Sequence, residues 1–149
     1  MLLRSNDISL EHLEEFRAAI EGSAAYLAAR RITPEGIDEL RNLLTQAESL
    51  FLQGLDQWDA FVRADEAIHQ DIARASANPL YDYVLGSIHA NIHHFYDTFL
   101  QADSEIMAEN YRDLKAICTA IIKKEAEEAG DLMRAHVRRF ASYMQEQRR

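Results

Sequence analysis

A carboxylate and an imidazole, Asp65 and His69, stand four residues apart in a stretch whose apolar residues recur at helical spacing. That spacing places both side chains on one helix face, one turn apart. The rest of the face is apolar: Phe61, Ile68, Ile72 and Ala73. A carboxylate and an imidazole aimed into a core must be paired, hydrogen-bonded or bound to a metal, because leaving them bare is costly. Asp65 and His69 are therefore the first candidates for a functional site.

Further histidines follow at spacings that suit the same chemistry. His89 and His93 are again four residues apart and flank an apolar stripe, so we expect at least one of them to face inward, and we expect neighbouring His94 at the surface. His136 lies within the last apolar stripe, where a single histidine is ordinarily a satisfied core residue.

Together these side chains form a nitrogen and oxygen ligand set. Such a set suits zinc, manganese, nickel or iron. A buried hydrogen-bond network, in which Asp65 only orients His69, explains the same residues without a metal. The sequence leaves both interpretations open.

The elements that must position these residues are all predicted to be helical. Five glycines and two prolines leave little material for hairpins. Thr33-Pro34 and Asn78-Pro79 have the form of helix starts. The predicted helices cover 8–31, 34–54, 57–77 and 79–99, and from residue 104 to 144 one long helix and two shorter ones fit equally well. With no linker or repeat, residues 1–149 are expected to form a single domain.

Composition narrows the function classes. The formal charge of −9 argues against nucleic-acid binding by these residues alone. A single cysteine, Cys118, excludes an internal disulfide and is expected to serve only in packing, which fits a cytoplasmic protein. No apolar run approaches the roughly 20 residues that a bilayer requires. Arg17 and Glu21, four residues apart, are most simply explained as a surface ion pair.

Four segments, in order, resemble the effector-binding C-terminal domain (FCD) of the FadR branch of the GntR transcription regulators. LEEFRAAIEGSAAYLAAR is similar to the opening signature, and DEAIHQDIARASANPL to its Asp-x-x-x-His motif with the trailing Asn-Pro. DLKAICTAI lies where the family has Glu-His-x-x-Ile-x-x-Ala-Ile, and EAEEAGDLMRAHV resembles the closing helix that ends in histidine. The resemblance implies an antiparallel bundle of six or seven helices, with a break near residues 123–125.

The same resemblance implies a metal site. It makes Asp65, His69 and His136 ligands of a divalent ion, with zinc favoured over nickel, manganese or iron. The family's remaining histidine falls on Leu114, which cannot bind a metal. The resemblance leaves His93 or His89 as a substitute ligand, and His93 is the preferred one.

The resemblance also implies a function, which is not enzymatic. Metal-containing relatives sense a small organic acid, such as a hydroxy acid, sugar acid or dicarboxylate, and Arg17 would bind its carboxylate, with His89 and His93 lining the pocket. The domain would be a homodimer that contacts DNA only through a winged-helix domain preceding residue 1. The alternatives are a metal-free domain that senses an acyl-CoA, a dimerisation module with a vestigial pocket, and a small helical metalloenzyme.

Overall fold

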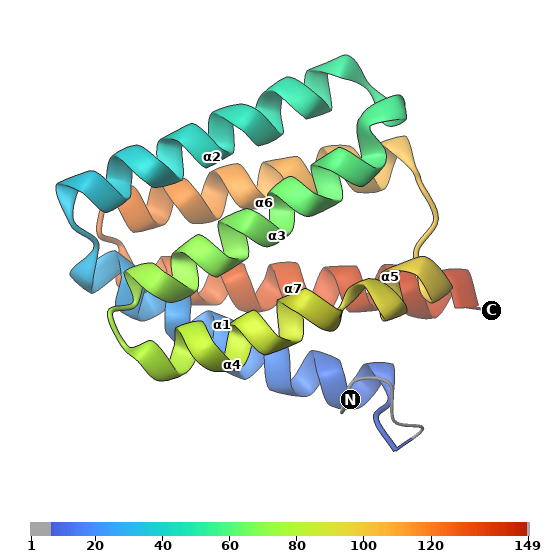
Figure 1. The fold of residues 1–149 in the computed structure, drawn as a ribbon, viewed down its shortest axis with the longest axis horizontal. Helices are drawn as coiled ribbons and strands as arrows, with labels where there is room; N and C mark the ends of the chain where they lie inside the picture. The colour runs from blue at the N-terminus through green and yellow to red at the C-terminus, as the bar shows by residue number, and fades with distance from the viewer. Residues whose placement is uncertain (1–6, 149) are drawn as a thin grey trace.

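Helices make up nearly all of residues 7–148, the part of the chain that the computed structural model describes (Figure 1). They are α1 (Leu10–Arg31), α2 (Pro34–Gln53), the 3-10 turn η2 (Leu55–Gln57), α3 (Trp58–Ala75), α4 (Pro79–Asn91), α5 (His93–Phe99), α6 (Ser104–Ile122) and α7 (Ala126–Arg148). No strand occurs among these residues. The predicted all-α bundle of six or seven helices is confirmed. The side chain of His94, expected at the surface, lies outside the described part.

Polar side chains cap the helices where the sequence signals predicted that they begin. Thr33 accepts a hydrogen bond from the Gly36 amide at 3.0 Å, and Asn78 accepts one from the Leu80 amide at 3.1 Å. In both cases a proline follows at the first helical position, where its missing N–H is not needed. These caps fix the starts of α2 and α4.

Two interruptions divide the C-terminal half of the chain. The break between α6 and α7, which the family resemblance implied, is confirmed, and Lys124 adopts a positive φ of 62° there. The other break, at Ile92 between α4 and α5, was not predicted, and the expectation of one helix over 79–99 was wrong. Ile92 is fully buried and fits the apolar pattern, so nothing in composition marks the break.

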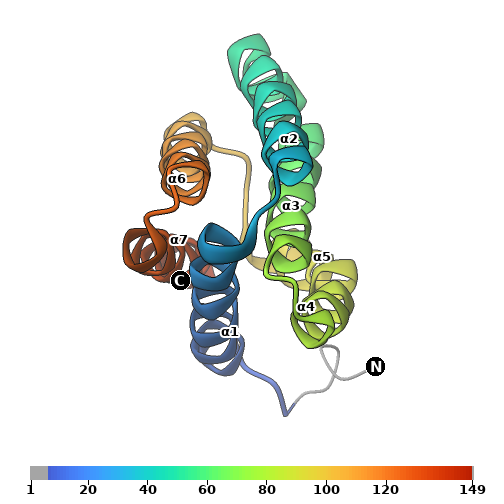
Figure 2. The same cartoon turned by 90° about the vertical axis from the view of Figure 1, so that its left-hand side faces the viewer.

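Small residues allow α1 and α7 to approach closely along most of their length. The buried face of α1 carries Ala18, Ala25 and Ala28. A Cβ atom on Gly130 of α7 would lie 3.2 Å from the carbonyl oxygen of Gly22 in α1. Seen end-on, α1 lies between the α6–α7 pair and the helices α2 to α5 (Figure 2). This arrangement buries α1 on several sides, which no single apolar stripe would require.

The helix α3 carries its polar residues between two apolar clusters. Ile68 and Ile72 pack into one cluster, with residues of α1, α2, α6 and α7. Val62 and Ala73 pack into the other, with residues of α1, α4, α5 and α7. Side chains of α3 that point between these clusters are therefore enclosed by protein on all sides.

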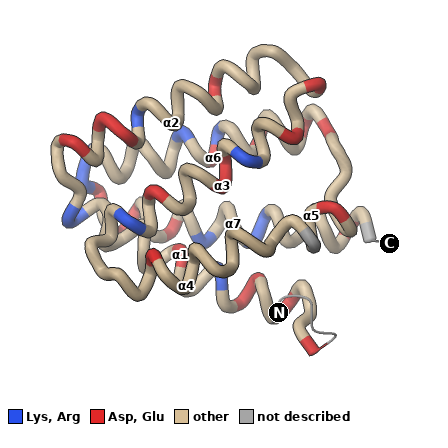
Figure 3. Tube along the Cα trace, viewed as in Figure 1, with Lys and Arg blue, Asp and Glu red and all other residues tan. Residues whose placement is uncertain are grey.

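Charged residues are distributed over the outside of the bundle. In the view of Figure 3 basic positions are scattered among acidic ones, without a continuous basic stripe. Within the described residues no helix is long and apolar enough to span a membrane.

Candidate metal centre

The structure brings three of the predicted ligands together. Asp65, His69 and His136 are each at most 3% exposed. His69 Nε2 lies 3.2 Å from Asp65 Oδ1 and 3.2 Å from His136 Nε2, and His136 Nε2 lies 3.7 Å from Asp65 Oδ1. Two residues come from one face of α3 and the third from α7, so only the packed bundle assembles the group.

A second carboxylate stands behind each of the two imidazoles. His69 Nδ1 lies 2.5 Å from Glu21 Oε1, and His136 Nδ1 lies 2.9 Å from Asp113 Oδ2. Because a carboxylate only accepts hydrogen bonds, both Nδ1 atoms must carry protons and donate them. In neutral imidazoles the Nε2 atoms then present lone pairs to each other and to Asp65. Metal-bound histidines in proteins are oriented in this way by their outer nitrogen.

Three lone pairs that converge in a buried space require a cation. Asp65 Oδ1 has no hydrogen-bond partner among the described residues. Burial alone would raise the pKa of Asp65, but the charge of a protonated His69 and the close approach of both imidazoles outweigh burial and hold it well below its usual range. Asp65 is therefore an anion whose charge must be balanced by a metal ion or by an extra proton on a histidine.

The charged residues around the cluster leave one negative charge without a compensating positive charge. Glu21 Oε2 accepts a hydrogen bond from Arg17 Nε at 2.6 Å, and Asp113 is paired with Arg139. Each of these carboxylates already has an arginine, and Asp65 does not. With neutral histidines the cluster holds one uncompensated negative charge, which suits a divalent cation together with one anionic ligand.

A proton is the competing solution. Burial lowers the pKa of His69, but Glu21 and Asp65 outweigh burial and raise it to about 10. A protonated His69 would donate to Glu21 through Nδ1 and to Asp65 through Nε2. This corresponds to the metal-free network that the sequence left open.

A second group of potential metal ligands overlaps the first. Glu21, His69 and His89 also place ligand atoms within 4.8 Å of one another. His89 Nε2 lies 3.0 Å from Glu21 Oε1, and its Nδ1 lies 2.9 Å from Gln70 Oε1. Because Glu21 is already neutralised by Arg17, this group attracts a cation less strongly than the group that contains Asp65. His89 does face inward, as expected for one member of its pair.

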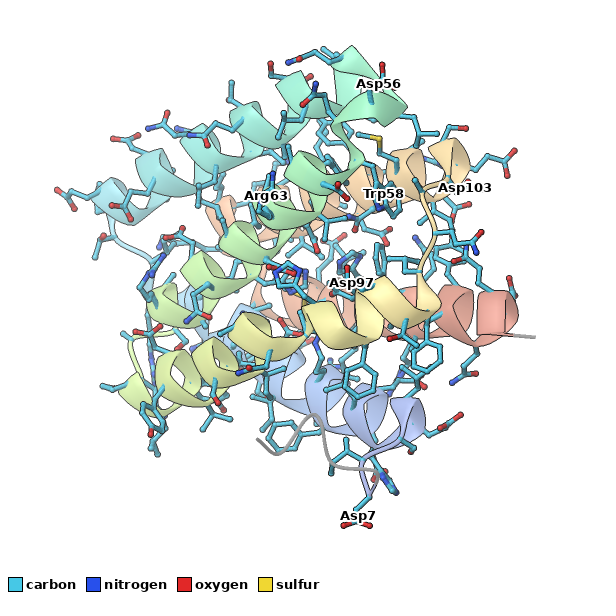
Figure 4. The ribbon with its side chains drawn as sticks, turned by 45° about the vertical axis from the view of Figure 1, so that its right-hand side comes forward. Asp7, Asp56, Trp58, Arg63, Asp97 and Asp103 are labelled. Atoms are coloured by element: carbon cyan, nitrogen blue, oxygen red, sulfur yellow. The ribbon has the colours of Figure 1, made fainter. Side chains whose placement is uncertain are left out.

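Other predicted residues have different surroundings. Leu114 is fully buried in the apolar core. His93 Nε2 lies 3.0 Å from Glu66 Oε2, and its side chain is 45% exposed. A hollow of about 480 Å³ opens beside it, lined by residues of α3 and α5 that include Trp58, Arg63 and Asp97 (Figure 4). Among the described residues, neither potential ligand group includes His93.

Arg17 and Glu21 form the expected ion pair, but the expectation that it lies on the surface was wrong, because the two residues are only 5% and 1% exposed. The pair is buried because other helices enclose α1 on several sides. Burial lowers the pKa of the Arg17 guanidinium, but Glu21 and Tyr96 more than offset this effect and raise it, so Arg17 stays charged. Its Nη1 lies 3.5 Å from the Tyr96 hydroxyl. An arginine has five N–H donors, so several remain for a ligand.

Two carboxylates of the cluster were missed as functional residues. Glu21 follows Arg17 by four residues, a spacing that surface ion pairs also show. Asp113 immediately precedes Leu114 and was not considered as a partner of His136. Its position directly before Leu114, where the family has a histidine, could have identified Asp113 as a residue of the site.

Comparison with known proteins agrees with the fold. Residues 12–139 match the FCD domain family. The HTH-type transcriptional repressor NanR of Escherichia coli is 35% identical over 72 residues, which are 48% of this chain and 26% of the repressor. The chain thus matches about a quarter of the length of that curated relative.

Two solved structures share the fold. A Streptococcus agalactiae GntR superposes with a TM-score of 0.74 at 23% identity, over 89% of this chain and 58% of that one. Escherichia coli McbR/YncC superposes with a TM-score of 0.75 at 17% identity, over 93% and 66%. The curated relative NanR is a transcriptional repressor. The chain belongs to the FCD domain family, the ligand-sensing domains of GntR-type transcription regulators.

Proposed function

We propose that this domain senses a small organic acid through a divalent metal ion held by Asp65, His69 and His136. The observation that carries the proposal is the convergence of His69 Nε2, His136 Nε2 and Asp65 Oδ1, with both Nδ1 atoms committed to other carboxylates. When bound, a divalent ion such as zinc supplies a Lewis-acidic position that binds a carboxylate oxygen.

Charge balance supports an acid as the ligand. The cluster holds one uncompensated negative charge, a divalent ion changes it to one positive charge, and a monocarboxylate neutralises the whole. Arg17 is linked to the proposed ligand His69 through Glu21, which contacts both residues, and Arg17 has donors remaining. A guanidinium binds a carboxylate through a planar fork of donors, so Arg17 would hold the effector's second oxygen.

The effector would act as a switch in a larger protein. We infer that residues 1–149 form one effector-binding domain that dimerises, and that DNA contact belongs to a separate winged-helix domain of the full-length regulator. Effector binding would bias two arrangements of the helices and so change the spacing of the DNA-binding domains. Light scattering should give twice 17.1 kDa for this chain, and a monomer would refute the dimer.

The metal proposal has a matched pair of variants for its test. Asp65 and Asp71 are both buried carboxylates on α3, but Asp71 pairs with Arg74 outside the cluster. Asp65→Asn should abolish zinc binding, measured by elemental analysis after dialysis, and the zinc-dependent thermal shift given by organic acids. Asp71→Asn should retain both. Equal zinc contents in the two variants would refute the site.

A metal-free sensor is the second candidate, favoured by the raised pKa of His69. In that case the purified wild type contains no metal, soaking with zinc adds none, and organic acids or acyl-CoA stabilise it without metal. The wild-type measurement therefore distinguishes the two candidates before any variant is made.

A further inference from the structure

Asn110 is a buried polar residue to which the cluster described above assigns no role. Among the described residues three buried side-chain oxygens have no hydrogen-bond partner: Asp65 Oδ1, Glu66 Oε1 and Asn110 Oδ1. Asp65 belongs to the metal centre, and the other oxygen of Glu66 is paired with His93. Asn110 is 2% exposed. A buried amide oxygen without a partner is unfavourable, so a native chain that keeps one has a reason outside its own packing.

The position of Asn110 follows from its helix. It lies four residues before Leu114 and three before Asp113, on the inner face of α6. A short loop joins α6 to α7, so the two packed helices run antiparallel. Because Asp113 contacts His136, Asn110 lies opposite residues about one turn beyond His136, where Phe140 is buried.

Aromatic contacts place that turn beside the arginine. The Phe140 ring lies 5.5 Å from the His136 ring and 6.3 Å from the Tyr96 ring, between centroids. The Tyr96 hydroxyl lies 3.5 Å from Arg17 Nη1. Asn110 is therefore about one helical turn, roughly 5.4 Å along α6, from Asp113, the partner of His136, and opposite the turn of α7 whose Phe140 contacts Tyr96. A short carbon chain spans that distance.

We propose that Asn110 determines effector specificity by binding a hydroxyl group on the carbon chain of the acid. This inference rests on the proposed function, since the metal and Arg17 hold the carboxylate and fix the direction of the chain. The free Oδ1 of Asn110 accepts a hydrogen bond, so its ligand must offer a donor. A hydroxyl supplies such a donor, whereas a plain alkyl chain leaves Oδ1 unpaired.

Two six-carbon acids test the proposal on the zinc-loaded protein. D-Gluconate carries hydroxyls along its chain and hexanoate carries none. Calorimetry should show that the wild type binds gluconate at least about tenfold more tightly than hexanoate, because a site built to bind a hydroxyl rejects the analogue without it. In Asn110→Leu this ratio should fall to about one, with hexanoate affinity unchanged. Asn42→Leu, at an exposed asparagine of α2, should keep the wild-type ratio.

The outcomes separate this inference from the function on which it rests. If the wild type binds both acids equally well, or Asn110→Leu keeps the wild-type ratio, the role of Asn110 is refuted and the acid sensor stands. A hydroxyl that binds only the metal would also leave the ratio of Asn110→Leu unchanged. If both Asn110→Leu and the smaller Asn110→Ala lose zinc or unfold, Asn110 is structural and the inference is wrong. If the zinc-loaded wild type binds neither acid, both proposals fail.

Discussion

Asp113 offers a sharp test of the metal centre, because it contacts a proposed ligand without occupying the metal position. Its Oδ2 accepts a hydrogen bond from His136 Nδ1 at 2.9 Å, and its Oδ1 accepts one from Arg139. In Asp113→Asn only one side-chain oxygen remains for two donors, so His136 loses its fixed orientation. Loss of such a partner weakens metal binding by about 10- to 100-fold, which corresponds to about 1.4–2.7 kcal/mol.

The metal-free protein should change much less. The Arg139 side chain is 42% exposed, and a pair of this kind is worth about 1 kcal/mol or less. Zinc at roughly 1,000 times the wild-type Kd stabilises the wild type by about 4.1 kcal/mol, whereas at the same concentration the variant gains only about 1.4–2.7 kcal/mol. At about 2–4 °C per kcal/mol for a domain of this size, the zinc-induced rise in Tm should shrink by about 3–11 °C.

Differential scanning fluorimetry with and without zinc gives this shift, and competition with a chelating dye gives the Kd. The control is Asp131→Asn, which makes the same substitution in an exposed ion pair with Arg134 of α7. It should leave the zinc response at the wild-type value. A zinc Kd for Asp113→Asn within about threefold of wild type, below the expected range, would refute the orienting role of Asp113.

The remaining predictions concern the effector and the core. Arg17→Met should weaken acid binding by about 1.5–3 kcal/mol and also lower Tm, since Glu21 is left buried without its arginine; adding Glu21→Gln should restore much of the Tm but not the affinity, measured by calorimetry. His93→Ala should retain zinc, because His93 is paired with Glu66 in the structure, whereas Leu114→His should lower the zinc Kd by adding a fourth ligand; elemental analysis that shows zinc lost in His93→Ala would restore His93 as the substitute ligand. Cys118 is fully buried, and burial raises the pKa of its thiol to about 12, so a disulfide reagent at pH 8 should react only after unfolding.

Local signals in the sequence predicted most of the fold. The Thr33-Pro34 and Asn78-Pro79 starts depend on side chains that bond within the same turn, so they can be recognised without tertiary structure. The break at Ile92 has no such signal, because a buried isoleucine suits either a helix or a turn in a packed bundle. Tertiary packing, not composition, determines where α4 ends.

Part of the site was also predictable from local spacing in the sequence. Helical spacing alone placed Asp65 and His69 on one face, and burial of that face implied that they need partners. The convergence with His136 depends on how α7 packs against the other helices, which spacing cannot give. Burial of Glu21 could not be inferred either, because α1 is rich in alanine and its enclosed sides do not form one apolar stripe.

Because His69 belongs to both potential ligand groups, it limits the number of metal ions that the cluster can bind at once. Its Nδ1 faces Glu21 and its Nε2 faces Asp65, and a neutral imidazole has only one free lone pair. Two ions bound at once would have to share an imidazole that had lost both protons. A zinc titration of this cluster should therefore reach its plateau at one equivalent per chain, although the cluster contains ligand atoms for two sets. Because the proton on Nδ1 is held by Glu21, the free lone pair of His69 lies on Nε2, and the single ion is expected in the group that contains Asp65.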